Sequence, residues 1–401
     1  MNLLDPVAPL RMDVQTLLSE EDGNEIVLLH DPLDIAFQDV AIDTDSLYIL
    51  ELMDGVRSLR DIHRLLGERL QTEIDMAQLI KFVKSLDDMM YLENTAYNEA
   101  IEFIESETRP AICAGTVYPK SPDELRSYLS QILAKANKRA YPANAIAAVI
   151  PHIDFRVNSD VYAQVFQAIC DTEFDVIIHI GTSHYGWQDR FILTYKDFET
   201  PLGMLQTDKE LIDALRERLS FEPTFNDIAY MPEHSLELHH VFLKHMFPDR
   251  DFTVLPVLVT SFGDFIQTER SPTDDECIME FCSTLKSVVE ESGKKALYLV
   301  SGDLAHIGKR FGDDYDAATQ LDEVKITDYE IMDAMVRGNA DLYFKRIADN
   351  QDKTRICGLA PVYTMLNAIH PGKGVAFDYA QWDDAPTGSA VTFGSAAWYP
   401  A

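Results

Sequence analysis

Hydrophobic and polar positions follow two different periods along the second part of this chain. Short apolar runs that end in small or turn residues predict buried strands, and runs with an apolar residue every three or four positions predict helices. The pattern places strands at 145–150, 175–180, 191–195, 252–259, 296–300, 375–379 and 390–396, and helices at 159–170, 208–219, 233–246, 274–291, 322–337 and 358–369. This alternation predicts an α/β domain over residues 141–401, with a mostly parallel central sheet flanked by helices. The two closing strands follow a short connection and can pair antiparallel.

The first hundred residues show a different pattern. It predicts, in order, extended runs at 25–29 and 37–42 and helices at 45–53, 59–66 and 76–86. Ser58 is expected to cap the second helix, with Asp61 completing a capping box. Three short helices with a small β element predict a winged-helix-like domain over residues 1–100. Residues 101–140 contain three prolines ahead of a helical run at 123–138 and are expected to form a helical connector.

Charge and composition narrow the classes of function. The chain has 401 residues and a formal net charge of −33, from 67 acidic against 34 basic residues. Such a surface repels phosphate backbones, so no nucleic-acid partner is expected. No apolar run approaches the ~20 residues that cross a bilayer, and no secretory signal precedes the first strand. Five scattered cysteines give no disulfide framework, which indicates a reducing cytoplasm.

The candidate chemistry lies where three predicted strands end. His152 follows Ala-Val-Ile-Pro, His184 closes Gly-Thr-Ser-His, and Asp303 and His306 stand in Ser-Gly-Asp-Leu-Ala-His. The carboxyl ends of parallel strands meet at one sheet edge, where ligands bind in open α/β folds. Three imidazoles and a carboxylate at that edge suggest a metal site. If a helical turn follows the strand, Asp303 faces His306 and can orient it as a general base.

Two further segments carry reactive groups. Residues 233–240, Glu-His-Ser-Leu-Glu-Leu-His-His, are helical by pattern but lack the spacing of the zinc-protease motif His-Glu-x-x-His. His240 and His245 fit ordinary surface or core positions. Cys357 precedes the last long helix, whose N-terminal dipole favours a thiolate. The chain contains no nucleophile elbow, Walker loop or dinucleotide fingerprint.

These segments resemble, in order, landmarks of the Memo family, which is component B of the bacterial AmmeMemoRadiSam gene set. The matching landmarks are Pro151-His152, Gly181-Thr-Ser-His184, Thr200-Pro-Leu-Gly203, Glu233-His-Ser-Leu-Glu-Leu-His239, Ser301-Gly-Asp-Leu-Ala-His306, Cys357-Gly358 and Gly394-Ser-Ala-Ala. The resemblance covers roughly residues 140–400 and implies the fold of class III (LigB-type) extradiol dioxygenases, which are non-haem iron proteins. A second, shorter resemblance links residues 50–62 to PqqD-like domains, small winged-helix modules that often hold a peptide. Memo proteins often have an arginine after Cys-Gly, whereas Leu359 follows here.

The Memo resemblance implies a set of roles for the site residues. His152, His184 and Cys357 would be the metal ligands, and Asp303 and His306 would share their pocket. Glu233, His234 and His239 would line it. Fe(II) is the expected metal, and because two imidazoles and a thiolate form a soft set, copper or zinc also fits.

Three functions stay open at this point. The first is a metal-dependent redox enzyme with oxygenase-like chemistry on a small molecule or a peptide, in which His306 (oriented by Asp303) or His239 is the acid–base. The second is a non-catalytic protein that binds a peptide or phosphopeptide on the same scaffold. The third is a zinc hydrolase in which Glu233 activates water. The gene set implies a radical-SAM protein and the A component as partners.

Overall fold

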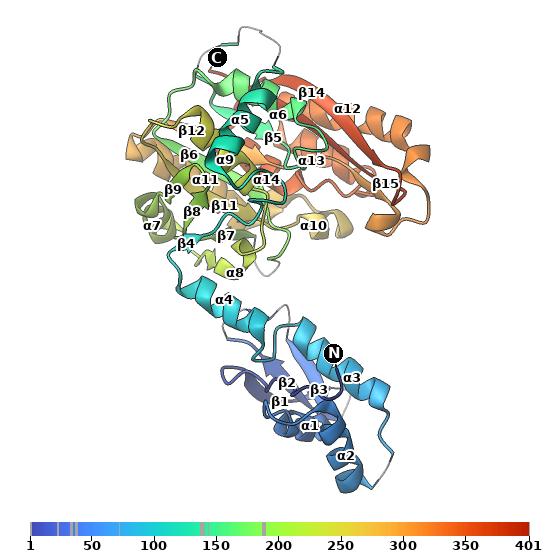
Figure 1. The fold of residues 1–401 in the computed structure, drawn as a ribbon. Coiled ribbons are helices and arrows are strands. Elements are labelled where there is room, and N and C mark those ends of the chain that lie inside the picture. Colours follow the sequence, from blue (N-terminus) through green and yellow to red (C-terminus); the bar gives the residue numbers. More distant parts are fainter. Residues whose placement is uncertain are drawn as a thin grey trace. The chain divides into compact units, whose positions relative to one another are not determined.

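The protein is described here by a computed structural model that covers residues 2–400 except 22–23, 33–34, 37–38, 72, 137–140, 143 and 187–189. The chain forms two compact units, residues 1–106 and 107–401, coloured blue to cyan and cyan to red in Figure 1. Residues 107–136, which belong to the predicted connector, fall within the larger unit.

The small unit combines a three-stranded antiparallel sheet with four helices. Its strands are β1 (Gln15–Glu21), β2 (Asn24–His30) and β3 (Val40–Asp43), and its helices are α1 (Leu47–Leu52), α2 (Leu59–Leu70), α3 (Met76–Asp88) and α4 (Thr95–Glu105). The expected extended run at 37–42 corresponds to β3, although residues 37–38 lie outside the described residues. The pattern did not anticipate β1 or α4.

The start of α2 shows how the sequence sets a local structure. The Asp61 backbone N–H donates to the Ser58 hydroxyl at 3.2 Å, and the Ser58 N–H donates to the Asp61 carboxylate at 3.2 Å. This reciprocal pair is the predicted capping box, and it satisfies two backbone donors that the helix itself leaves unpaired. Ile62 and Leu66 then turn into the buried core of the unit.

The large unit is built on a mixed sheet whose centre is parallel. Its central strands, in spatial order, are β15 (Ser389–Trp398), β5 (Ala147–Ile150), β12 (Ala296–Ser301), β6 (Val176–Thr182), β11 (Thr253–Val259) and β9 (Gly203–Thr207). From β5 to β9 each strand pairs parallel with the next. The long strand β14 (Val375–Asp384) pairs antiparallel with β15, as the sequence allowed. The fold is therefore α/β, with the expected parallel centre and with β15 and β14 added antiparallel on one side.

Short strands at the margins complete the sheet, and the sequence pattern missed most of them. They are β4 (Thr108–Arg109), β7 (Phe191–Leu193), β8 (Asp197–Thr200), β10 (Thr224–Phe225) and β13 (His306–Gly308). Only β7 was predicted, as the run at 191–195. Strands of two to four residues carry too few side chains to display a period, so they form through pairing in the sheet rather than from a sequence pattern.

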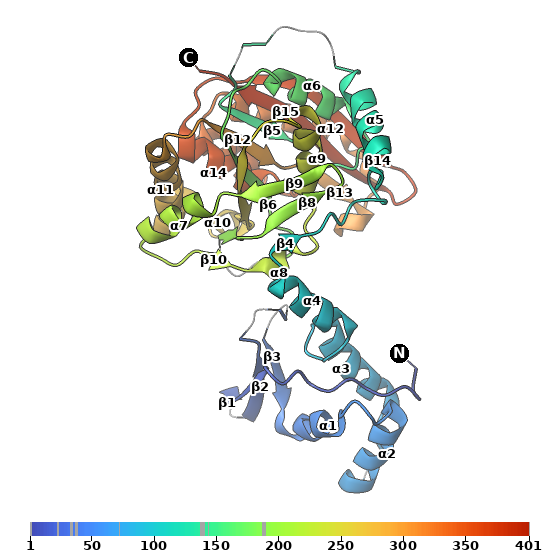
Figure 2. The same ribbon diagram turned by 60° about the vertical axis from the view of Figure 1, so that its left-hand side comes forward.

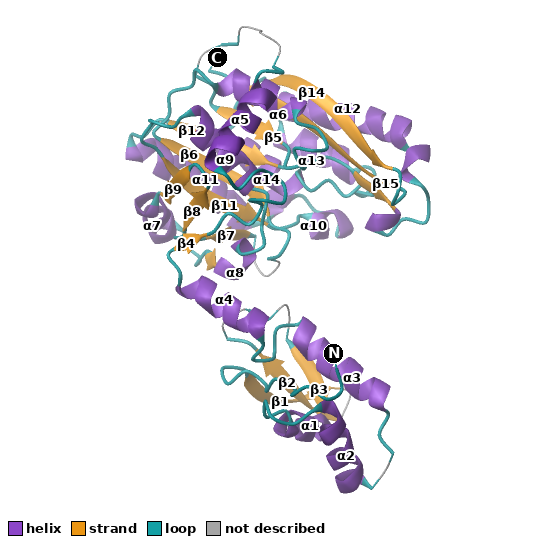
Figure 3. Cartoon of the chain, viewed as in Figure 1, coloured by secondary structure: helices purple, strands orange, loops and turns teal. Residues whose placement is uncertain are grey.

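Two buried cores cover the two faces of this sheet. Helices α5 (Pro122–Leu133), α6 (Asp160–Ile169) and α9 (Glu237–Met246) pack on one face, and α7 (Lys209–Arg218), α11 (Glu276–Ser292), α12 (Leu321–Val336), α13 (Ala340–Ala348) and α14 (Leu359–Ile369) pack on the other. Figures 2 and 3 show the strands between these helices. Neighbouring residues of β6 alternate between the cores: Ile177 joins the first and Ile178 the second. This alternation is the two-residue period of a strand buried on both sides.

Two single-turn helices, α8 (Asp227–Tyr230) and α10 (Gly263–Gln267), lie in the connections of the large unit. Of the helices that the described residues form, none has both the length and the apolar character that a membrane span requires.

Candidate metal centre

Three neighbouring strands of the large unit end at one edge of the sheet. β5, β12 and β6 are parallel and adjacent, with β12 in the middle. Each is followed, two positions beyond its last residue, by a residue that the sequence placed in the site: His152 after β5, His184 after β6 and Asp303 after β12. The parallel arrangement therefore brings together side chains that are far apart in the sequence, as expected.

His152 is held with one ring nitrogen free. Its Nδ1 lies 3.0 Å from the Ser301 hydroxyl, and that hydroxyl donates its own proton to the Ser235 carbonyl. Ser301 can therefore only accept from His152, so Nδ1 carries the proton and Nε2 keeps a lone pair. The backbone N–H of His152 donates to Asp303 Oδ1 at 3.0 Å. Burial lowers the pKa of His152 well below its usual value, so the ring is neutral.

The free Nε2 of His152 faces a sulfur and a carboxylate. Cys357 Sγ lies 3.5 Å from it and Asp303 Oδ2 lies 3.6 Å from it. The backbone N–H of Asp303 points at the same sulfur at 3.1 Å, and Thr182 donates to the Cys357 carbonyl at 2.9 Å. The His152 ring and the Asp303 backbone thus contact the thiol, and Thr182 holds the Cys357 backbone.

The expected thiolate character of Cys357 is wrong for the protein without a bound cation. Burial, followed by the nearby charge of Asp303, raises the pKa of the thiol well above its usual value, although the Asp303 N–H and Thr182 lower it. Desolvation outweighs the helix dipole here. Burial also raises the pKa of Asp303 to about 7. A cation at this point would have to displace protons from this pair.

His184 is oriented by Glu233. Its Nδ1 lies 2.9 Å from Glu233 Oε1, and its backbone N–H donates to Oε2 at 2.8 Å. Burial lowers the pKa of His184, but the hydrogen bond and charge of Glu233 outweigh it and the pKa is raised overall. Because Nδ1 faces the carboxylate, Nε2 is the nitrogen left to act as a ligand.

Glu233 and His234 do not lie on a helix, contrary to the pattern that predicted one over 233–246. The helix α9 begins only at Glu237, and the preceding residues form a loop. In that loop the Glu233 carboxylate also accepts the backbone N–H of Ser235 at 2.9 Å. A carboxylate committed to a ring and two backbone donors is poorly suited to activate water, which weakens the zinc-hydrolase alternative.

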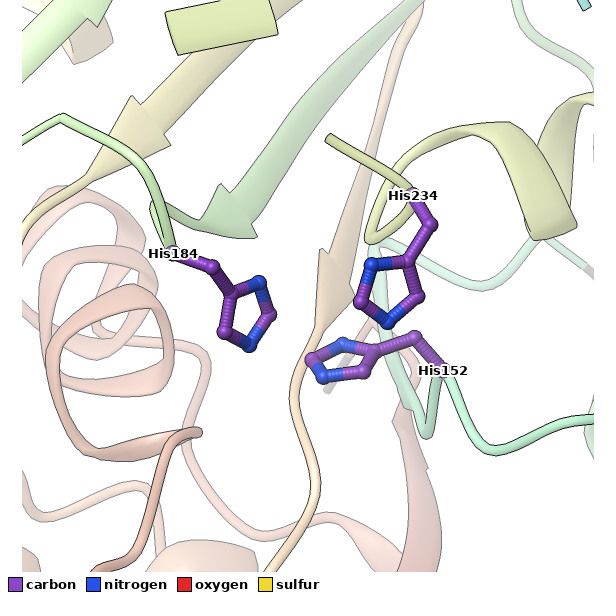
Figure 4. A group of neighbouring side chains, drawn as sticks. All are labelled: His152, His184 and His234. Carbon is purple, nitrogen blue, oxygen red and sulfur yellow. The ribbon is translucent and has the colours of Figure 1, made fainter. Parts of the chain in front are cut away.

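His234 completes a group of three imidazoles (Figure 4). Its ring stacks on that of His184, with centroids 5.1 Å apart and planes at 19°, and it meets His152 edge-on at 5.3 Å. Ligand atoms of these three residues lie within 4.8 Å of one another, as do those of His152, Asp303 and Cys357. Across the described residues, His152 is the shared member of both groups, and neither group unites His184 with Cys357.

The two groups differ in their access to solvent. The His152 and Asp303 side chains are almost fully buried, whereas the side chains of His184 and His234 are 30% and 37% exposed. The centre therefore has a closed side with sulfur and carboxylate and an open side with imidazoles.

His306 does not pair with Asp303, contrary to expectation. Residues 302–305 form no helical turn, and His306 begins β13, which pairs antiparallel with β15. The His306 N–H donates to the Thr354 carbonyl, and its C=O accepts from the Arg355 side chain. Its Nδ1 lies 3.1 Å from the carbonyls of Leu304 and Arg355. Burial lowers the pKa of His306 to about 4, so it is neutral and held by the backbone.

His239 is not a member of either group of potential metal ligands, and its ring is committed to other contacts. Its side chain points from α9 into the core, with Nε2 2.9 Å from the Pro151 carbonyl and Nδ1 3.1 Å from Nε2 of His179. Both ring nitrogens are occupied, and burial lowers the pKa of His239 to about 4.

A buried ion pair holds the loop that carries Glu233. The Arg109 guanidinium donates to the Glu237 carboxylate and to the Glu233 carbonyl, and all three groups are buried. Glu237 also accepts the backbone N–H of Cys113 at 2.8 Å and the hydroxyl of Tyr118. The carboxylate is thus fully hydrogen-bonded, as a buried charge must be.

Sequence reasoning missed several residues that support the site. Ser301 is the one hydroxyl ending an otherwise apolar strand, a signal that was available. Arg109 and Glu237 are 128 positions apart, and no local pattern links them. His179 lies inside an apolar run that predicts a buried strand, and that pattern does not single out the histidine.

The chain belongs to the Memo family. The family model described as "Memo-like protein" matches residues 109–397, which includes every site residue above. A MEMO1 family protein of Aquifex aeolicus is 28% identical over 387 residues, covering 94% of this chain and 96% of the relative. This chain is also similar to MEMO1 family protein TTHA0924 of Thermus thermophilus (27% over 350 residues; 86% and 99% covered) and to Mbar_A1422 of Methanosarcina barkeri (27% over 260 residues; 65% and 86%).

The Aquifex aeolicus relative aligns over nearly the whole chain, so the match extends into the small unit as well as the large one. Among solved structures, uncharacterized protein JW3007 from Escherichia coli K12 covers 63% of this chain and 99% of its own, with a TM-score of 0.35 and 12% identity. That likeness is too weak to bear on the fold.

The donor set suits a transition metal. Imidazole and thiolate ligands favour iron, copper and zinc, whereas Mg²⁺ and Ca²⁺ take oxygen ligands. Each of these two imidazoles has one nitrogen fixed by a neighbour, Ser301 for His152 and Glu233 for His184. Such supporting contacts are typical of metal-binding histidines.

Proposed function

We propose that this Memo family protein is a metal-dependent redox protein that holds one Fe(II) ion among His152, His184 and Cys357. The observation that carries the proposal is the approach of the Cys357 sulfur to within 3.5 Å of the unprotonated Nε2 of His152. In the metal-free protein the thiol can donate to that nitrogen, and a metal ion bound by both atoms would replace this contact. Copper or zinc in the same place would satisfy the same donors.

Bound Fe(II) would supply open coordination positions for O₂ and for one-electron chemistry, and the substrate would be a small molecule or a peptide. The chain's own residues divide the remaining work. Ser301 and Glu233 set the ring orientations of His152 and His184. Burial raises the pKa of Asp303 to about 7 in the metal-free protein, so at neutral pH this carboxyl can give up its proton when a cation binds beside it. His234, on the open side, is placed to contact the substrate.

The proposal is tested by metal content. The full chain is purified without oxygen and analysed for iron, copper and zinc, beside His152→Ala, Cys357→Ala and, as a control on the outer part of α9, His245→Ala. We expect near-stoichiometric iron in the unaltered protein and in His245→Ala, and loss of metal from the other two. A folded, metal-free unaltered chain would overturn the proposal and favour the peptide-binding alternative.

The identity of the metal separates the remaining alternatives. Iron whose spectrum responds to O₂ supports redox chemistry. Zinc alone, with no response to O₂, would overturn the redox proposal and favour a hydrolytic or structural centre.

We further propose that the radical-SAM protein and the A component of the gene set are partners, and that the small unit holds a peptide as PqqD-like domains do. Co-expression of the full chain with each partner, followed by affinity purification, tests the first part. Recovery of either partner in stoichiometric amount supports it, and recovery of neither contradicts it.

A further inference from the structure

A chain of three buried imidazoles runs beneath the metal centre. It links His240 and His239 on α9 with His179 on β6. His240 Nε2 lies 3.0 Å from His179 Nδ1, and His179 Nε2 lies 3.1 Å from His239 Nδ1. His239 Nε2 then reaches the Pro151 carbonyl at 2.9 Å. All three side chains are at most 1% exposed, and nothing in the proposed chemistry uses them.

The position of the chain follows from the two elements that carry it. His179 shares the strand face of Ile177, which packs in the core beneath α9. The His179 and His239 rings stack with centroids 5.2 Å apart, and Phe166 and Phe198 enclose the outer rings. Imidazole rings enclosed by aromatic side chains must hydrogen-bond to one another, because a buried N–H without an acceptor costs folding free energy.

The Pro151 carbonyl fixes the proton on every ring. A carbonyl can only accept, so His239 donates from Nε2 and its Nδ1 must accept. His179 therefore donates from Nε2, and His240 does the same in turn. The last nitrogen, His240 Nδ1, is left bare, and it is buried with no hydrogen-bond partner among the described residues. Burial lowers the pKa of all three rings, so each carries a single proton.

This arrangement cannot conduct protons to the metal centre. It ends on an amide carbonyl, which is too weak a base to accept a proton and pass it on. The three imidazoles can instead fix the position of the Pro151 carbonyl, because each ring donates its one proton to the next acceptor in the same direction.

The structure assigns His239, backed by His179, as a positioning residue for His152. His239 holds the carbonyl of Pro151, which is bonded directly to the nitrogen of His152. Asp303 holds that nitrogen from the other side, and Ser301 holds the ring. Hydrogen bonds from α9, from β12 and from the loop after β12 thus hold the short Pro151–His152 segment on three sides. The inference rests on the proposed function of His152 as a metal ligand.

The test compares three substitutions of His239 in the full chain. In His239→Gln the side-chain amide nitrogen is separated from Cβ by as many bonds as Nε2 of histidine is. It can therefore still donate to the Pro151 carbonyl. His239→Asn is one carbon shorter and cannot reach, and His239→Leu has no donor. Leu243→Ala, in the same buried face of α9, serves as the control for lost packing without lost contact to Pro151.

The first readout is Co²⁺ binding and the d–d spectrum of the bound ion. We expect His239→Leu and His239→Asn to weaken Co²⁺ binding by about tenfold or more, the size typical of lost supporting contacts. His239→Gln should restore most of the affinity and the spectrum. Leu243→Ala should lower the melting temperature and leave both unchanged. Equal affinity in all four variants would overturn the assignment.

The second readout needs no metal. Imidazole ¹⁵N spectra of the metal-free protein should show His152 protonated at Nδ1, a pattern that shifts in His239→Asn and returns in His239→Gln. Unchanged His152 signals in His239→Asn would overturn the positioning role. If the unaltered protein binds no Co²⁺, the proposed function fails, and the ¹⁵N result still decides the positioning role. If His239→Leu does not fold, the Gln and Asn pair carries the comparison.

Discussion

Gly302 and Gly358 touch backbone to backbone beside the candidate metal centre. A Cβ on Gly302 would lie 2.4 Å from the Cα of Gly358, and a Cβ on Gly358 would lie 2.9 Å from the Asp303 carbonyl oxygen. The Gly358 N–H also donates to that oxygen at 3.0 Å. This contact allows the loop after β12 and the start of α14 to approach closely enough for Asp303 to meet the sulfur of Cys357.

Gly302→Ala is therefore expected to separate the two loops. The added methyl meets backbone rather than a flexible side chain, so the loops must move apart and the Asp303–Cys357 contact lengthens. We expect weaker Co²⁺ binding by about tenfold or more, together with a stability loss of about 1–3 kcal/mol from overpacking. Titration calorimetry and thermal unfolding measure the two effects. Gly263→Ala, which meets only a serine hydroxyl at 3.3 Å, is the control and should retain binding.

Ser301→Ala tests the tautomer of His152. Without the hydroxyl, Nδ1–H loses its acceptor, so nothing holds the ring with Nε2 toward Cys357 and Asp303. We expect the affinity for Co²⁺ to fall by about 10–100-fold. Ser395→Ala is a matched control, because that buried hydroxyl has no partner among the described residues and its loss should leave binding unchanged. Equal affinities in the two variants would contradict the tautomer assignment.

The Arg109–Glu237 pair is expected to stabilise the large unit only as a pair. Arg109→Met leaves the Glu237 carboxylate buried without a cation, at a cost of about 3–5 kcal/mol. Chemical denaturation should show the double variant Arg109→Met/Glu237→Gln recovering part of that loss, because no unpaired charge remains. A double variant as unstable as the sum of both single variants would show that the two groups do not interact.

Asp328 makes the stability depend on pH. Burial raises its pKa to about 6, although Thr392 and Tyr379 donate to Oδ2 and lower it. An acid with a raised pKa in the folded state binds protons more tightly there than in the unfolded chain. Stability therefore falls as pH rises from about 4 to about 6, by at most about 3 kcal/mol.

Asp328→Asn removes this penalty, so it is expected to raise the melting temperature at pH 8 and to have little effect near pH 4. Thermal unfolding across this range measures the difference. Asp333 lies on the exposed face of the same helix and pairs with Arg337 at the surface. Asp333→Asn is therefore the control, and its effect on the melting temperature should not depend on pH in this way. An equal gain for Asp328→Asn at both pH values would contradict the raised pKa.

The sequence predicted the parts of this fold that depend on local periodicity. Apolar runs identified the central strands other than β9, which the pattern missed, and Ser58 with Asp61 identified the start of α2. The same reasoning placed His152, His184 and Asp303 at one edge, because parallel strands align their ends. The position of Cys357 before the last long helix marked it as a reactive thiol, whereas its role as a metal ligand came from the family resemblance.

Where periodicity misled, tertiary contacts were responsible. The pattern extended α9 back to 233, but Arg109 holds the Glu233 carbonyl outside the helix and so turns the preceding loop toward His184. His306 was expected on a helical turn, yet pairing with β15 draws it into a strand. The thiolate expected of Cys357 failed because burial depends on the complete fold, which no window of sequence contains.

Arg109 also limits how this protein can be shortened. It stands only three positions beyond the point where the chain divides into its two units, yet it neutralises a carboxylate deep inside the second. A fragment that starts at residue 107 keeps the Arg109 guanidinium. A fragment that starts at residue 111 lacks it, so the Glu237 carboxylate is left buried without a cation. Any loss of stability in the shorter fragment would then reflect the absence of Arg109 rather than the absence of the first hundred residues.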